Sequence, residues 1–161
     1  MAMVECVTME RRELKKRSKP GDGSRLKIGI AVAQFNEDIT TGLLNGAREV
    51  LHAWKVKDGN VHVAHVYGSF ELPFACQRLI KKHKLDAIIA LGCLVRGETK
   101  HDEYIAHAVF NALQDIALKN DLPIGLGVLT VNTLAQARSR SRADANHGAR
   151  AAEAALQSVL L

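Results

Sequence analysis

One segment near the middle of the chain gathers side chains that can bind an anion and transfer a proton. An apolar run at residues 86–91 is typical of a buried strand, and a glycine-containing loop follows it at residues 92–101. This loop carries Arg96, Thr99 and His101 to the start of the next predicted helix. A helix N-terminus presents free N–H groups and a positive dipole end, which suit a phosphate, and an imidazole changes charge near neutral pH. The combination indicates a small-molecule enzyme that captures phosphate and moves protons here.

Apolar strand patterns alternate with amphipathic helix patterns along the rest of the chain. In the first predicted helix, for example, Leu43, Ala47 and Val50 recur at helical spacing. Strands joined by helices form parallel βαβ units, so we expect a doubly wound α/β layer with helices on both faces of a four-stranded sheet. The predicted strands cover residues 26–33, 61–66, 86–91 and 123–130, and the predicted helices cover 38–55, 72–83, a stripe from 105 to 116, 133–141 and 146–160.

Ligands bind beyond the carboxyl ends of the strands in such a sheet, and two further strand ends carry distinctive residues. Phe35 follows the first strand, where it either stacks on a planar ring or fills the core. Ser69 and Glu71 follow the second strand and can bind hydroxyl groups. The same two residues also suit an ordinary helix start, with serine as the N-cap and glutamate near the positive dipole end.

The phosphate-binding hypothesis has structural alternatives as well. Thr99 stands three residues before Asp102, a spacing typical of helix capping, so the threonine hydroxyl has a second use. Arg138, Arg140 and Arg142 follow the fourth strand. One of these guanidinium groups can hold a phosphate through two parallel hydrogen bonds, whereas the alternative is a solvated helix face.

The composition fits one domain preceded by a basic segment. The chain has 161 residues, 47% of them hydrophobic, and a net charge of +5. Turn-forming residues at 19–24 separate a flexible basic tail, 1–24, from a domain at 25–161. No basic face with interleaved aromatics indicates nucleic-acid binding, and no apolar run is long enough for a membrane span. A cytoplasmic location follows as the default, and the cysteines, which form no Cys-x-x-Cys pair, are expected to be reduced.

The histidines are poorly spaced for a metal site. His62 and His65 lie on one predicted strand, where their spacing directs them to opposite faces. His101 and His107 lie on one predicted helix, about 240° apart around its axis, so they cannot share an ion. The chain also lacks a phosphate-loop lysine motif and a Gly-x-Gly-x-x-Gly, which removes the sequence support for a nucleotide cofactor. We expect neither a metal nor an organic cofactor.

Several short segments, taken in order along the chain, form a specific set. They are Phe35-Asn36, Gly68-Ser-Phe-Glu-Leu-Pro73, Gly92-Cys-Leu-Val-Arg-Gly-Glu-Thr-Lys-His101, Pro123-Ile-Gly-Leu-Gly-Val-Leu-Thr130, and Gln136-Ala137 with Arg140. This set resembles the lumazine synthase (6,7-dimethyl-8-ribityllumazine synthase) family of the riboflavin pathway, from about residue 26 to the C-terminus. The resemblance implies a three-layer α/β/α, flavodoxin-like fold with a four-stranded parallel sheet in a single domain.

The resemblance also implies a reaction and the residues for it. Members of the family join 5-amino-6-(D-ribitylamino)uracil, a pyrimidine, to 3,4-dihydroxy-2-butanone 4-phosphate, a sugar phosphate, and release phosphate and water without a metal or organic cofactor. By this resemblance His101 is the catalytic histidine and Phe35 stacks on the uracil ring. The other matching positions are Ser69, Phe70 and Glu71 at the ribityl chain and ring, Cys93, Leu94 and Val95 at the uracil, Glu98, Thr99 and Arg140 at the phosphate, and Leu126 where the adjacent subunit often contributes a phenylalanine.

The family's sites lie between the subunits of a pentamer, and some members assemble pentamers into a hollow shell, so the resemblance implies a homo-oligomer. The chain departs from the family pattern Asn-Lys-Gly-x-Glu-Ala-Ala, because His147 replaces the lysine and Arg150 the acidic residue. Since that lysine lies close to the active site, His147 joins the predicted substrate-binding residues. The departures keep a second hypothesis open, a scaffold paralogue with little or no turnover. A third is an unrelated flavodoxin-like binding module.

Overall fold

Four parallel strands, in the order β2-β1-β3-β4, form the centre of the molecule. The computed structural model describes residues 19–161 of the chain. The strands are β1 (Ile28–Ala33), β2 (Val61–Val66), β3 (Ala87–Val95) and β4 (Ile124–Val131). Every neighbouring pair is parallel, so all the strands point to the same edge of the sheet.

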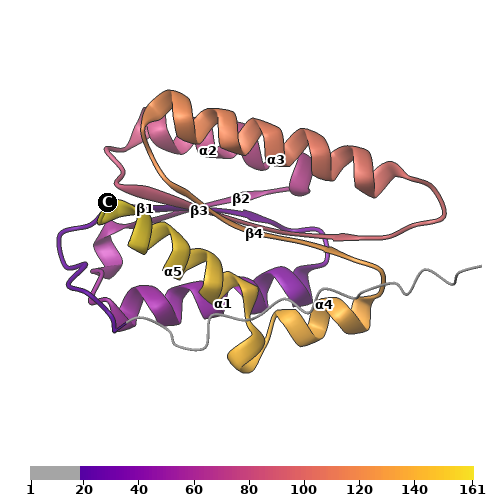
Figure 1. Ribbon diagram of the computed structural model, residues 1–161, viewed down its shortest axis with the longest axis horizontal. Helices are drawn as coiled ribbons and strands as arrows, with labels where there is room; N and C mark the ends of the chain where they lie inside the picture. The colour runs from indigo at the N-terminus through magenta and orange to yellow at the C-terminus, as the bar shows by residue number, and fades with distance from the viewer. Residues whose placement is uncertain (1–18) are drawn as a thin grey trace, which may run out of the picture.

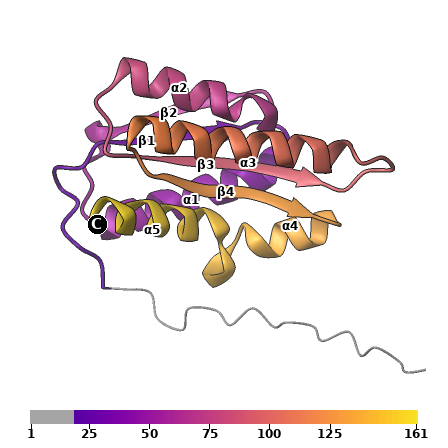
Figure 2. The same cartoon turned by 45° about the horizontal axis from the view of Figure 1, so that its top comes forward.

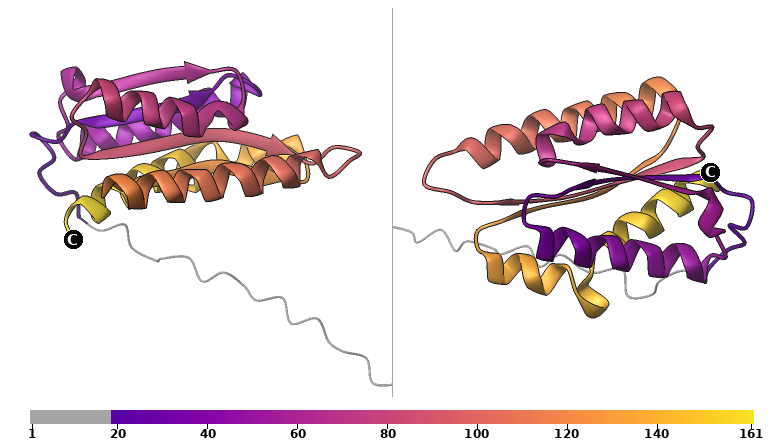
Figure 3. Two further views of the ribbon diagram at one scale, coloured as in Figure 1. Left: turned by 90° about the horizontal axis from the view of Figure 1, so that it is seen from above. Right: turned by 180° about the vertical axis from the view of Figure 1, so that it is seen from behind.

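Helices cover both faces of this sheet. They are α1 (Glu37–Ala53), α2 (Leu72–Lys82), α3 (His101–Asn120), α4 (Leu134–Arg140) and α5 (His147–Val159), with short 3-10 turns η1 (Asp58–Asn60), η2 (Ser69–Glu71) and η3 (Ala143–Ala145). In Figure 1 α2 and α3 lie above the sheet while α1, α4 and α5 lie below it, and the view from behind in Figure 3 agrees. A cluster of buried apolar side chains fills the space on each side of the sheet. Within residues 19–161 no helix is long and apolar enough to cross a membrane.

The three-layer α/β/α architecture predicted from the alternating patterns is confirmed. β1 is buried at every residue, as its nearly continuous apolar run predicts for a strand covered on both faces. Ile28 and Ile30 belong to the cluster beneath α1 and α5, whereas Ala31 and Ala33 belong to the cluster beneath α2 and α3. Because successive side chains of a strand point to opposite faces, this one apolar run contributes to the cores on both sides of the sheet.

β3 is the main departure from the sequence-based expectations. The prediction that this strand ends at Leu91 and gives way to a loop at Gly92 is wrong. The strand continues to Val95 because β4 pairs with it along residues 92–95, whereas its pairing with β1 stops at Leu91. Gly92 serves close packing and not a turn, since a Cβ there would lie 2.5 Å from Ser69 Oγ.

The first described residues pack against the body of the protein. Gly23 is buried, and its backbone N–H donates to the carbonyl of Trp54 over 2.6 Å. A Cβ on Gly21 would lie 2.8 Å from the Trp54 ring. Most of the predicted flexible tail, residues 1–24, lies outside the described residues, so the tail and its boundary with a domain at 25–161 stay predictions.

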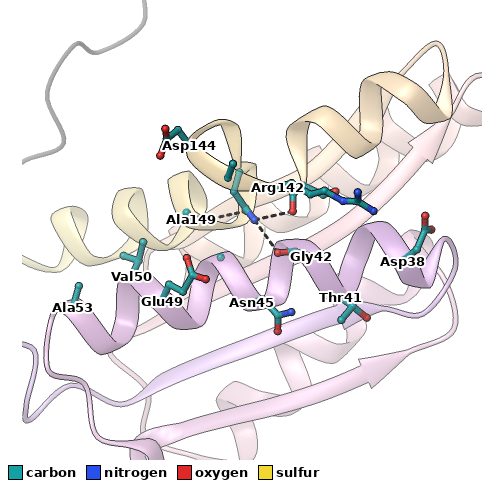
Figure 4. Close-up of a pocket in the computed structure, with 14 residues that line it drawn as sticks. Asp38, Thr41, Gly42, Asn45, Glu49, Val50, Ala53, Arg142, Asp144 and Ala149 are labelled. Atoms are coloured by element: carbon teal, nitrogen blue, oxygen red, sulfur yellow. Dashed lines mark hydrogen bonds between the residues drawn. The ribbon is translucent and has the colours of Figure 1, made fainter.

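Asn146 joins α1, α4 and α5 on the lower face of the sheet, and is only 6% exposed. Its Nδ2 donates to the carbonyls of Gly42 (2.8 Å) and Ser141 (2.9 Å). Its Oδ1 accepts from the N–H groups of Gly148 (2.8 Å) and Ala149 (3.1 Å), which caps α5. Figure 4 draws bonds of this network between α1 and the α4–α5 segment. Both donors and the acceptor of the buried amide are thus in use.

Replacing Asn146 by alanine removes the cap of α5 and the two buried bonds that Nδ2 donates, so we expect the free energy of unfolding to fall by about 2–4 kcal/mol. Thr133→Ala is the matched control, because Thr133 is exposed and its hydroxyl accepts from the N–H of Gln136 at the start of α4. Loss of this cap should lower the free energy of unfolding by about 1 kcal/mol. Urea denaturation measures both changes, and equal losses would contradict the role of the buried network.

Candidate active site

A cavity of about 770 Å³ opens at the carboxyl ends of the strands. Its walls come from the loop after β1, the segment after β2, the end of β3, the beginning of α3 and the start of α4. In Figure 2 the arrowheads of β3 and β4 point to this end of the sheet. Most of the predicted site residues line the cavity: Phe35, Ser69, Phe70, Glu71, Cys93, Leu94, Val95, Thr99 and His101. An open parallel sheet binds its ligands at this edge.

Phe35 belongs to the cavity and not to the core. The residue is 61% exposed, which excludes the alternative of a buried core phenylalanine. Its backbone N–H donates to the carbonyl of Tyr67 over 3.0 Å, and its ring centroid lies 6.3 Å from that of Tyr67 at an interplanar angle of 57°. An exposed ring on a cavity wall is suited to stack on a planar ligand.

Two buried oxygen atoms in the cavity wall have no hydrogen-bond partner within residues 19–161: Ser69 Oγ and Asp102 Oδ1. Ser69 is 5% exposed and lies inside η2, so the alternative in which it caps a helix is wrong. Glu71 is held differently, because its Oε2 accepts from the N–H of Gly68 over 2.9 Å. Buried polar atoms are nearly always partnered in folded proteins, so these two oxygens are exceptions, and both belong to residues that line this cavity.

The end of β3 offers backbone groups and no reactive side chain. Burial raises the pKa of Cys93 to about 11, with a further contribution from the negative charge of Asp38. The thiol therefore stays protonated at neutral pH and is a poor nucleophile. Leu94 and Val95 are apolar, so polar recognition by this wall has to come from the backbone.

His101 is the first residue of α3 and lies on the cavity wall. The alternative in which Thr99 caps this helix is wrong, because the N-cap position is Lys100 and no side chain caps it. The first N–H groups of an uncapped helix are available to an anion. Thr99 and His101 thus flank a helix start, which is the arrangement expected for phosphate capture beside a proton-transfer group.

Two other predicted residues on the same side do not line the cavity. Glu98 is exposed on the loop between β3 and α3. Leu126 lies on β4, where Gly125 and Gly127 face α5, so Leu126 faces the opposite side of the sheet. It is 49% exposed at this edge strand, and a second molecule has access to it.

Arg140 and His147 also lie outside the cavity, in the layer on the other face of the sheet. Arg140 ends α4, and its Nη1 donates to the carbonyl of Gln136 over 3.0 Å. His147 begins α5. α4 and α5 lie below the sheet and α3 above it (Figure 1), and of α4 only Leu134 lines the cavity.

A second cavity, of about 550 Å³, lies between α1 and the α4–α5 segment (Figure 4). Of the candidate residues named from the sequence, only Arg142, one of the three arginines after the fourth strand, lines it. Within residues 19–161 no group of three His, Cys, Asp or Glu side chains is placed to hold a metal ion. His62 instead stacks on His83, with ring centroids 3.8 Å apart. The strand-end cavity is therefore the candidate active site.

The strand-end cavity is also lined by residues that were not predicted from the sequence: Tyr67, Asp102, Ile105 and Leu134. Tyr67 directly follows β2, so the rule that strand ends carry the site would have found it. Asp102 had a conventional explanation as a capping residue, and Ile105 belonged to the apolar stripe of α3. Leu134 carried no signal, because an exposed leucine at a helix start is ordinary.

Two kinds of comparison place the chain among known proteins. The profile of the family described as 6,7-dimethyl-8-ribityllumazine synthase matches residues 25–161. The chain belongs to this family. A lumazine synthase of Parabacteroides distasonis is 41% identical over 138 residues, which cover 86% of this chain and 85% of the relative. One of Porphyromonas gingivalis is 41% identical over 137 residues, covering 85% and 84%.

In this lumazine synthase family member we expect both described cysteines to resist thiol reagents at pH 8. Burial raises the pKa of Cys76 to about 12 and that of Cys93 to about 11. The thiolate fraction at pH 8 is then about a thousandth or less, so a Cys6→Ser variant should react with a disulfide reagent at least about a hundredfold more slowly than glutathione. Unfolding should restore the ordinary rate, which is the control. Fast labelling of the folded variant would contradict the raised pKa values.

Proposed function

We propose that this chain condenses 5-amino-6-(D-ribitylamino)uracil with 3,4-dihydroxy-2-butanone 4-phosphate to form 6,7-dimethyl-8-ribityllumazine, the penultimate step of riboflavin synthesis. Family membership carries the proposal. The strand-end cavity supports it, because an exposed aromatic ring, unpartnered polar atoms and a histidine at a helix start line the same space. No feature of the described residues favours the alternative of an inactive scaffold.

The pyrimidine substrate occupies the part of the cavity between the loops after β1 and β2. Phe35 stacks on the ring, and the backbone at the end of β3 contacts the ring edge. Ser69 Oγ, which has no partner among the described residues, is suited to a ribityl hydroxyl. Glu71 already holds the turn through the Gly68 N–H, and a carboxylate has further lone pairs for a ligand hydroxyl. Phe70, 61% exposed, adds an apolar wall.

The sugar phosphate occupies the other end, at the start of α3. The free N–H groups and the dipole of this helix favour a dianion, and the Thr99 hydroxyl lies on the same wall. Glu98 contributes through its backbone, because its carboxylate would repel the phosphate. Arg140 of a second copy of the chain supplies a guanidinium group to the phosphate.

The chemistry needs proton transfers more than any strong nucleophile. The pyrimidine's 5-amino group attacks the ketone carbon, and loss of water gives an imine. Phosphate then leaves, and the second amine closes the ring with loss of another water. Each step moves a proton, and His101 lies beside the phosphate end, so its imidazole serves as the proton carrier. Orientation of two bound substrates supplies much of the remaining rate.

A second copy of the chain completes the site. Arg140 and His147 do not line the cavity of their own chain, and their helices lie on the other face of the sheet from α3, which supports a site shared between neighbouring molecules. The edge strands β2 and β4 and the half-exposed Leu126 offer surface for such an assembly. We expect a pentamer or a multiple of pentamers, as in the family. A cytoplasmic location and the absence of nucleic-acid binding stay predictions.

Replacing His101 by alanine should lower turnover by about ten- to a thousandfold while the protein still assembles, because a general acid–base group is lost. His107→Ala is the matched control on the same helix, since His107 is exposed and does not line the cavity. Lumazine fluorescence after mixing both substrates measures turnover. Equal rates for wild type and His101→Ala would remove His101 from the mechanism.

The shared site predicts complementation between two impaired variants. Arg140→Ala should raise the KM for the sugar phosphate and, like His101→Ala, leave little activity at low substrate. When the two are denatured together and refolded as an equal mixture, about a quarter of the shared sites combine an intact His101 with an intact Arg140. Activity should then rise well above that of either variant refolded alone. If the mixture shows no gain, both residues act within one chain or Arg140 has no role.

A further inference from the structure

Asn36 lies between β1 and α1, and its side chain bonds to a neighbouring strand and not to the helix that it precedes. Its φ of 60° and ψ of 52° lie in the left-handed region, which asparagine adopts more readily than most residues. It occupies the N-cap position of α1, yet its side chain makes no capping bond. Instead its Nδ2 donates to the carbonyl of Cys93, 3.1 Å away at the cavity end of β3.

The carbonyl of Cys93 takes this donor because β1 has already ended. The pairing of β1 with β3 stops at Val32 and Leu91, while β3 continues to Val95 with only β4 beside it. A backbone acceptor that loses its strand partner has to find another or stay unsatisfied at a cost in free energy. The Asn36 amide therefore replaces the strand bond that β1 no longer supplies.

The same loop is attached to β2 on its other side. The N–H of Gln34 donates to the carbonyl of Val66 over 2.8 Å, and the N–H of Phe35 to that of Tyr67 over 3.0 Å. The Phe35 ring is largely exposed, so core packing does not fix it. Its place over the cavity depends on the backbone bonds on either side, and Asn36 makes the bond to β3.

We propose that Asn36 is a positioning residue that sets the separation between the Phe35 ring and the backbone at the end of β3, and so the slot for the pyrimidine. The inference rests on the proposed function, in which Phe35 holds the ring by its face and β3 holds it by its edge. A planar ligand held in both ways tolerates little displacement of either wall. The start of α3, where the phosphate binds, is not connected to this bond.

Asn36→Gly tests the idea, because glycine keeps the left-handed backbone and removes only the amide. We expect the KM for the pyrimidine to rise about tenfold, the effect of losing roughly one hydrogen bond. The Kd of the pyrimidine alone, measured by fluorescence titration, should rise equally. The KM for the sugar phosphate should stay within about twofold of the wild type, because its wall is unchanged. Asn36→Asp, similar in shape but without a donor, should be impaired at least as much.

Lys55→Gly is the matched control, since Lys55 also has a left-handed backbone (φ 61°) but is exposed after the far end of α1. We expect Lys55→Gly to have the wild-type KM for both substrates. A wild-type pyrimidine KM and Kd in Asn36→Gly would overturn the inference. An equal rise in both KM values, or a loss of kcat alone, would also overturn it, because either indicates general damage to the fold.

The wild-type measurements separate this inference from the proposed function. If the wild type binds the pyrimidine but forms no lumazine, the proposed reaction fails, and the Kd comparison still decides the role of Asn36. If the wild type forms lumazine and Asn36→Gly binds as tightly, only the inference fails. If the wild type neither binds nor converts the pyrimidine, both are overturned.

Discussion

The difference in length between β3 and β1 decides where this protein can bind a ligand. β3 runs past the end of β1 with β4 on one side only, so the backbone groups of its last residues have no strand to bond on the other side. Backbone polar groups require partners. Asn36 takes the carbonyl of Cys93, while Leu94 and Val95 border the cavity. A single mismatch in the sheet thus creates both the hydrogen bond that holds the first loop and one wall of the cavity.

Close packing around small residues then sets how deep the cavity is and what surrounds it. Gly92 lets η2 approach β3 so closely that the Ser69 hydroxyl lies against its backbone. Gly125 does the same for α5 on β4, where a Cβ would collide with the backbone of Ala151, and a Cβ on Gly127 would lie 2.5 Å from Leu91 Cδ2 and 3.2 Å from Ala151 Cβ. These contacts bring η2 and α5 close to the sheet.

The sequence predicts the elements well because hydrophobic periodicity is local, and it fails where a distant neighbour decides. Gly92 has the appearance of a turn residue, but the pairing of residues 92–95 with β4 keeps it in a strand. Whether Phe35 is core or cavity depends on what packs around it, and the structure leaves it exposed. The capping alternatives for Ser69 and Thr99 failed because the chain begins its helices elsewhere. The bond from Asn36 to β3 joins residues far apart in sequence, and no local pattern indicates it.

The sheet lies between two groups of residues that the proposed function assigns to one site. Neighbouring strands lie about 4.8 Å apart and are joined by hydrogen bonds, so a guanidinium group below the sheet cannot pass through it to a ligand above. The proposed function accordingly assigns Arg140 to the cavity of another copy. The aromatic side chains Tyr67, Phe70 and Phe74 are mostly exposed on the described part of the chain. Folded monomers seldom leave such groups in water, so their exposure supports the association with a second copy that the proposed function requires.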